Sequence, residues 1–274
     1  MIVGKRDDGL LMVTQVAHAR LAGQLARMWG NEHFETPQPR DAVSVAADLH
    51  DEGWAEPDKL PLYNERTRRP ADFLEIDLRE HAAFYKAGVE KVAATDAYAG
   101  LLASMHWTGL YRGRWGSAFG MVRRDLDQEL QAFLDQVVRE QELAWVDVKS
   151  ALWDPSTRRG EFEERLWMNY DLLQALDVLS LLCCMCGTKR GVPENVLGAV
   201  PSTLHTERGS LRVNRINEET MAVSPWPLTA PEVELAVTGT VLEDRDYGSR
   251  EEVLDSLSAV GEVKLPVRLI PGDA

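Results

Sequence analysis

Histidine and aspartate side chains at six positions could carry chemistry in this sequence. His50 is followed directly by Asp51, so an imidazole nitrogen and a carboxylate oxygen can face one point in space. Three further histidines and a late aspartate fall, by counting, on the apolar stripes of other predicted helices: His18, His81, His106 and Asp177. Proteins bind divalent transition metals through imidazole and carboxylate ligands. The pattern therefore predicts a metal-binding core within a group of helices.

Five predicted helices must bring these side chains together. The first, over about residues 14–30, begins at the N-cap Thr14, and the fourth begins at the N-cap Asp96. Asp41 is the expected N-cap of the second helix. The second to fifth helices cover about residues 41–51, 78–94, 96–109 and 161–186. In each segment apolar residues recur every three or four positions, which is typical of a helix with one buried face.

Each of these side chains has a simpler interpretation, as a core histidine or aspartate satisfied by a hydrogen bond. The set as a whole weakens that interpretation. If an isolated His or Asp faced inward about a third of the time, five would do so by chance on the order of once in a few hundred. Asp177 also lies in an apolar run, where a buried carboxylate needs a partner. His33 and His205 lie away from the stripes and receive no role.

The remaining segments complete the expected fold. Residues 1–13 should form a β-hairpin around an Asp-Gly turn, and residues 121–150 a solvated outer helix. Residues 55–72 form a long excursion of the kind that often serves as a lid or binding loop. We expect a mainly α protein: a helical domain over residues 1–189, hairpin included, and an appended small α/β region over residues 190–274 that could share a sheet with the hairpin.

The net charge of −14 bears on the partners. It repels phosphate backbones, and no basic stripe with interleaved aromatic residues is present, so we expect no binding to long nucleic acid. A small anionic substrate is compatible with it, because the local charge of a pocket can oppose the net charge. A homo-oligomer is compatible as well.

Three clustered cysteines indicate the compartment. Cys183, Cys184 and Cys186 cannot form a disulfide framework, which favours a reducing environment. Cys183 and Cys186 have C-x-x-C spacing, but they lie within a helix without a second pair, and buried small apolar residues are the favoured interpretation. No apolar leader and no run of about 18 apolar residues is present, so we expect a soluble, cytoplasmic protein.

The order of the histidines and aspartates resembles the metal-ligand pattern of the HD superfamily of helical metalloenzymes. The likeness covers about residues 14–187 and leaves the C-terminal region outside. It implies an HD-type helical bundle. The chain also looks like an uncharacterised bacterial family of this length, through three stretches: Gln15–His18, His50–Trp54 and Ser104–Tyr111.

The resemblance implies two divalent metal ions, Fe or Mn, or else Zn, Co or Ni. It makes Asp51 the catalytic carboxylate that bridges them. The minimal ligand set would hold the first ion, and two additional histidines would complete the second: His18, His50, Asp51 and Asp177, then His81 and His106. In hydrolytic members a hydroxide between the two ions attacks phosphorus. In a smaller branch the same ligands hold two irons that activate oxygen to oxidise a C–H bond.

One position departs from the superfamily pattern. Many HD enzymes have a phosphate-binding lysine shortly after the aspartate, where this chain has Trp54. Arg112 and Arg114, or the arginines of residues 66–69, could bind substrate instead, and the alternative for all of them is solvated loop charge. Gln15 lies one turn before the first histidine and could orient substrate or water, or else face solvent.

Three functions follow from these expectations. The first is a dinuclear metal-dependent hydrolase that acts on a small phosphorylated or nucleotide-like substrate. The second is an HD-type mixed-valent diiron oxygenase that oxidises a small organic molecule. The third is a metal-binding, HD-like sensing module without catalysis.

Overall fold

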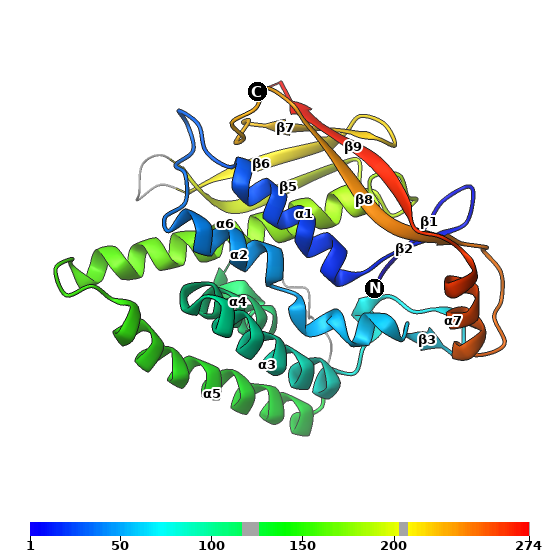
Figure 1. Cartoon of the computed structure of the whole chain (residues 1–274), viewed down its shortest axis with the longest axis horizontal. Helices are drawn as coiled ribbons and strands as arrows, with labels where there is room; N and C mark the ends of the chain where they lie inside the picture. The colour runs from blue at the N-terminus through cyan, green and yellow to red at the C-terminus, as the bar shows by residue number, and fades with distance from the viewer. Residues whose placement is uncertain (117–125, 203–207, 274) are drawn as a thin grey trace.

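A computed structural model of the chain describes residues 1–116, 126–202 and 208–273 (Figure 1). Its α-helices are α1 (Gln15–Met28), α2 (Arg40–Leu49), α3 (Leu78–Thr95), α4 (Ala97–Tyr111), α5 (Gln128–Leu152), α6 (Arg159–Met185) and α7 (Arg250–Ala259). Short 3-10 helices are η1 (Glu52–Ala55), η2 (Pro57–Lys59), η3 (Phe73–Glu75) and η4 (Gly113–Gly116). His205 and the first residues of the predicted outer helix, 121–125, lie outside the described residues.

A seven-stranded sheet covers one side of the helices (Figure 1). Its strands are β1 (Ile2–Lys5), β2 (Leu10–Val13), β5 (Glu194–Pro201), β6 (Arg208–Arg215), β7 (Thr220–Ser224), β8 (Val233–Leu242) and β9 (Val263–Pro271). They follow the order β1-β2-β8-β9-β7-β6-β5, and every neighbouring pair is antiparallel except β7 and β9. Within residues 55–72, β3 (Tyr63–Asn64) pairs with β4 (Arg69–Pro70).

The predicted fold class is wrong: the chain is not a mainly α HD-type bundle with an appended α/β region. About half of it is helical and about a fifth is strand. The N-terminal hairpin is an edge of the large sheet, because Leu10 of β2 pairs with Leu242 of β8 and Met12 pairs with Thr240. Strands from opposite ends of the chain thus form one sheet, which confirms the expectation that the C-terminal region could share a sheet with the hairpin. Such a pairing leaves no trace in the periodicity of a short window, which reports only local structure.

Two helices connect the sheet to the rest of the helices. In Figure 1, α1 and α6 lie next to the sheet, while α3 and α5 lie on the far side of the molecule. The main hydrophobic cluster joins both parts, since it contains Leu25 and Leu173 from these two helices and Val237 and Leu269 from the sheet. Residues on both sides of position 190 therefore share one core. The division into two folding units at that position stays a prediction.

Local signals for the helix ends hold in two of three cases. The Thr14 side chain accepts a hydrogen bond from the amide of Ala17, and Asp96 accepts one from the amide of Ala99, so both predicted N-caps are confirmed. The prediction for Asp41 is wrong, because α2 begins after Pro39 without a side-chain cap. Pro39 is itself the N-cap residue, with an extended backbone, and its side chain has no oxygen that could accept a hydrogen bond from the first turn.

None of the helices within the described ranges is both long and apolar enough to cross a bilayer. All three cysteines are buried at the end of α6, in agreement with their interpretation as core residues: Cys183, Cys184 and Cys186. Burial raises the pKa of each of these thiols, so their thiolate forms are disfavoured.

Candidate metal centre

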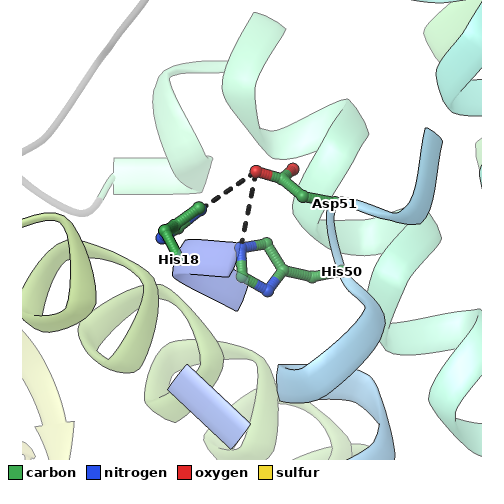
Figure 2. A group of neighbouring side chains, drawn as sticks. All are labelled: His18, His50 and Asp51. Carbon is green, nitrogen blue, oxygen red and sulfur yellow. Dashed lines mark hydrogen bonds and ion pairs between the residues drawn. The ribbon is translucent and has the colours of Figure 1, made fainter. Parts of the chain in front are cut away.

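Side chains from α1, α2 and the turn after α2 meet in the interior. His18 lies in α1, His50 forms the C-cap of α2, and Asp51 follows it directly. Each offers a ligand atom within 4.8 Å of the others, a group found by searching the described residues. Figure 2 shows both imidazole rings directed at the same carboxylate oxygen. The three side chains are at most 3% exposed, so no bulk water satisfies them.

Asp177 joins this group from α6. Its Oδ1 atom lies 3.7 Å from His18 Nε2 and 3.6 Å from His50 Nε2. On the other side, Asp51 Oδ2 lies 3.0 Å from His18 Nε2 and 3.8 Å from His50 Nε2. Two nitrogens and two oxygens thus face one another across a space of a few ångströms. The helical stripes predicted that His18, His50 and Asp177 point inward, and the burial of these side chains confirms it.

Outer hydrogen bonds orient both imidazoles. His50 Nδ1 lies 2.8 Å from the carbonyl oxygen of Ala47, so Nδ1 carries a proton and donates it. His18 Nδ1 lies 2.8 Å from Ser180 Oγ, and that hydroxyl donates its only proton to the carbonyl oxygen of Asp177. The hydroxyl must therefore accept from His18 Nδ1–H. When neutral, each ring turns the lone pair of Nε2 toward the centre, as in metal-binding histidines.

Outer partners also hold one oxygen of each carboxylate. The Tyr85 hydroxyl donates to Asp51 Oδ1, and Trp54 Nε1–H donates in turn to the Tyr85 oxygen at 3.3 Å. Arg114 Nη2 donates to Asp177 Oδ2 at 2.6 Å. Asp51 Oδ2 and Asp177 Oδ1 are therefore the oxygens that face the imidazoles.

The charges of the centre stabilise its ionised forms against burial. Burial raises the pKa of Asp177, but Arg114 and His50 lower it well below its usual range. Burial likewise raises the pKa of Asp51, which His50 and the other imidazoles lower below its usual range. Burial lowers the pKa of His50, but Asp51 and Asp177 raise it to about 9. In the metal-free centre the extra proton is therefore on His50, beside two ionised carboxylates, at a place where a cation can replace it.

A small cavity borders His18, Asp51 and Asp177, and His106 and His81 also line it, from α4 and α3. The His106 ring lies 4.8 Å from the His50 ring, and its buried Nδ1 has no hydrogen-bond partner among the described residues. Burial, and then the charge of His50, lower the pKa of His106 to about 3, so this imidazole is neutral. His81 Nδ1 lies 2.5 Å from the Tyr111 hydroxyl. Neither belongs to the group at ligand distance, so their metal-binding role stays a prediction.

The three residues predicted to bind substrate lie in different surroundings. Gln15 lines the cavity and is 3% exposed, so the alternative that it faces solvent is wrong. Its Oε1 atom has no hydrogen-bond partner in the described structure. Arg112 lies at the surface and pairs with Asp135 at 2.9 Å. Arg114 is buried against Asp177, so its guanidinium orients a candidate ligand.

The cavity beside the four candidate ligands is small and largely apolar. It encloses about 40 Å³, room for roughly three water molecules. Apolar and aromatic side chains make up most of its wall: Trp54, Phe73, Leu74, Ile76, Leu78, Tyr85, Leu110 and Leu181. The described lining includes no lysine or arginine. Leu74 is 38% exposed and marks the mouth.

Ser180 and Tyr85 bond to candidate ligands, although no pattern in the sequence had indicated a role for either. Both stand one helical turn after a candidate ligand, Ser180 three positions after Asp177 and Tyr85 four positions after His81. Residues at these spacings share a helix face. A search for hydroxyl groups one turn from each candidate ligand would therefore have found both.

Comparison with known proteins identifies the family. Over residues 1–244, the chain matches a family described as "Protein of unknown function (DUF3891)". No curated protein and no solved structure matches this chain. The family match gives no evidence for membership in the HD superfamily, and that resemblance stays a proposal. Because the match covers most of the sequence, the chain belongs to the DUF3891 family.

Proposed function

We propose that the protein is a metal-dependent hydrolase of the HD type, in which two imidazoles and two carboxylates hold one divalent cation: His18, His50, Asp51 and Asp177. One observation carries the proposal. In each of these side chains one polar atom is bonded to an outer partner, and another faces the common centre. Outer partners of this kind fix ligand orientation and tautomer in metal sites.

The donor set fits a divalent cation. His50 Nε2 is buried and has no hydrogen-bond partner among the described residues, so a Lewis acid would satisfy it. The two carboxylates and Arg114 together carry one net negative charge, which a divalent cation offsets. Two nitrogens and two oxygens suit Fe, Mn, Zn, Co or Ni. A bound ion would supply a coordinated water of lowered pKa, the nucleophile of hydrolytic metal sites.

The other residues of the cavity would hold and select the substrate. Gln15 directs an unpartnered carboxamide oxygen into the cavity and can bind a water or a polar substrate group. The volume of about 40 Å³ admits the reacting group of a substrate, while the rest of a phosphorylated or nucleotide-like molecule would lie outside the mouth at Leu74. The apolar wall would keep bulk water away from the centre, which strengthens the electrostatic interactions inside.

A second candidate function is an HD-type oxygenase that oxidises a small organic substrate. The apolar and aromatic wall favours it, because no basic side chain of the described lining can bind a phosphate group. A substrate that is oxidised at a C–H bond needs no basic side chain to bind it. Both functions would use His18, His50, Asp51 and Asp177, but the oxygenase, as a mixed-valent diiron enzyme, would need a second iron and oxygen as its co-substrate.

One experiment separates these functions. The full chain is purified without oxygen, its metal content is measured by inductively coupled plasma mass spectrometry, and it is assayed with Mn²⁺, Fe²⁺ or Co²⁺. Hydrolysis of small phosphate esters supports the first function, and substrate-dependent oxygen uptake supports the second. Bound metal without turnover would favour a sensing module.

Two variants control this experiment. We expect His50→Ala to lose the metal, because it removes a central ligand. His33→Ala should keep it, since the His33 side chain is 70% exposed, and His33 is neither a member of the ligand group nor part of the described cavity lining. Wild-type protein that binds no divalent metal would refute the proposed function.

A further inference from the structure

Helix α5 presents one face to the protein and the opposite face to solvent, on the side of the molecule away from the sheet (Figure 1). The inner face packs against α4, where Trp145 Nε1–H donates to Ser104 Oγ at 2.8 Å. The outer face carries Leu143 and Val146, which are 61% and 63% exposed. These are the two most exposed large hydrophobic side chains among the described residues. Isolated exposed apolar residues are common, but two within one turn of an outer helix indicate a contact surface.

Two charged residues flank Leu143 on the same face. Arg139 precedes it by four positions and Asp147 follows it by four, so the three side chains form one row, which we call the α5 stripe. Both charged residues are exposed, and neither side chain has an ion-pair partner among the described residues. Eight positions span about 12 Å along a helix, so these two charges do not pair with each other.

The α5 stripe is complementary to itself. When two copies of α5 pack antiparallel about a two-fold axis at Leu143, the two leucines meet, and each Arg139 lies opposite Asp147 of the second copy. One apolar contact is then flanked by two identical ion pairs. A parallel, in-register pair would instead place like charges side by side, which is unfavourable. The order of the three residues therefore favours the antiparallel arrangement.

The net charge of the chain opposes association at long range. Each copy carries a net charge of −14, so two copies repel each other as they approach. At physiological ionic strength salt screens charges that lie more than about 8 Å apart, whereas ion pairs within the contact are closer than that. The α5 stripe can therefore hold two copies together under these conditions. Because each copy contributes a single helix face, the interface is small, and we expect the dimer to dissociate on dilution.

We propose that the α5 stripe is a homodimer interface, in which two copies of this chain pack antiparallel through α5 with Leu143 at the centre. A second copy is the partner because the stripe supplies both members of each ion pair. The inference does not depend on the proposed function, since no residue of the stripe belongs to the described lining of the metal cavity.

Sedimentation velocity tests the proposal. Full-length protein is measured at physiological ionic strength over about a hundred-fold range of concentration, because the dimer population depends on concentration. We expect a monomer–dimer equilibrium in the wild type. Leu143→Glu should be a monomer throughout, because it places two carboxylates at the centre of the contact. Ile216→Glu is the matched control: Ile216 is 58% exposed but lies between β6 and β7, so this variant should dimerise like the wild type.

Charge reversal tests the antiparallel register. Arg139→Asp and Asp147→Arg should each raise the dissociation constant of the dimer by about tenfold or more, because like charges then face each other across the interface. The double variant Arg139→Asp/Asp147→Arg should restore the dissociation constant to near the wild-type value, since opposite charges face each other again. A general loss of stability would not be reversed by the second substitution.

Three outcomes would overturn the inference. The first is a wild type that stays monomeric at the highest concentration, a measurement that needs no variant. The second is a dimer that survives Leu143→Glu, or that Ile216→Glu weakens equally. The third is a double charge variant that dimerises no better than the single variants.

Discussion

Arg114 and Asp177 form an ion pair in which both side chains are almost fully buried, with exposed fractions of 1% and 5%. Arg114 lies in η4 just beyond α4, and Asp177 lies in α6, so the pair links the end of one helix to the centre of another. Arg114 has a φ of 56°, in the left-handed region that costs a non-glycine residue about 1 kcal/mol or more. The fold tolerates this strain at the position that places the guanidinium on Asp177.

Arg114→Met should strongly destabilise the metal-free protein. It leaves the buried carboxylate of Asp177 without its guanidinium partner, and loss of one partner of a buried pair costs about 3–5 kcal/mol. Urea unfolding of metal-free protein measures the change in the free energy of unfolding. Arg112→Met is the matched control, since its pair with Asp135 is exposed and should cost less than about 1 kcal/mol. Equal losses in the two variants would contradict the role of Arg114.

Ser180→Ala should weaken metal binding about 10- to 100-fold, because it removes the group that orients His18. Titration calorimetry with Mn²⁺ or Zn²⁺ gives the dissociation constants. Ser44→Ala serves as the control, because Ser44 is also buried but its hydroxyl has no hydrogen-bond partner among the described residues. An unchanged affinity in Ser180→Ala would show that the hydroxyl does not orient the ligand.

Metal binding should release a proton and weaken as the pH falls. The pKa of His50 is raised from 6.5 to about 9 in the metal-free chain, so near pH 7.5 the ring is protonated and a cation must displace that proton. Calorimetry in two buffers of different ionisation enthalpy counts the protons released. We expect about one at pH 7.5. A binding heat that is the same in both buffers would contradict this prediction.

The same shift affects the stability of the metal-free protein. A folded-state pKa above the unfolded value stabilises the protein below the unfolded value of 6.5, and this contribution is lost as the pH rises through about 9. Thermal melts between these limits should show a decline that His50→Gln reduces. A metal-free wild type whose melting temperature rises from pH 6.5 to about pH 9 would contradict the raised pKa of His50.

Gly88→Ala should destabilise the fold and disturb the centre. An added Cβ at Gly88 lies 2.6 Å from the Cα of Gly53, and overpacking of this kind costs about 1–3 kcal/mol. Chemical denaturation measures the loss. Gly160→Ala in α6 is the control, because a Cβ there meets no atom within 4 Å. Its free energy of unfolding should rise by at most about 1 kcal/mol, since alanine has the higher helix propensity. Equal stability of the two variants would exclude the close contact.

Several features of the centre could be predicted from short windows of sequence. The caps at Thr14 and Asp96 and the inward direction of His18 and His106 follow from helical spacing, and the structure confirms them. They are local properties, because a side chain and its helix face are set by residues within one or two turns. The error at Asp41 is also local, since Pro39, two positions earlier, is the N-cap residue and makes no side-chain hydrogen bond.

The partners of these side chains depend on contacts between distant segments. Asp177 meets Arg114 and Tyr85 meets Asp51 across helices, and Leu10 meets Leu242 across the sheet. No periodicity in the sequence encodes such pairs. Sequence by itself determined which residues turn inward, through the repeat of the helix. Tertiary structure alone decided which of them meet and which oxygen of each carboxylate remains open to a cation, because packing brings together groups that lie far apart along the chain.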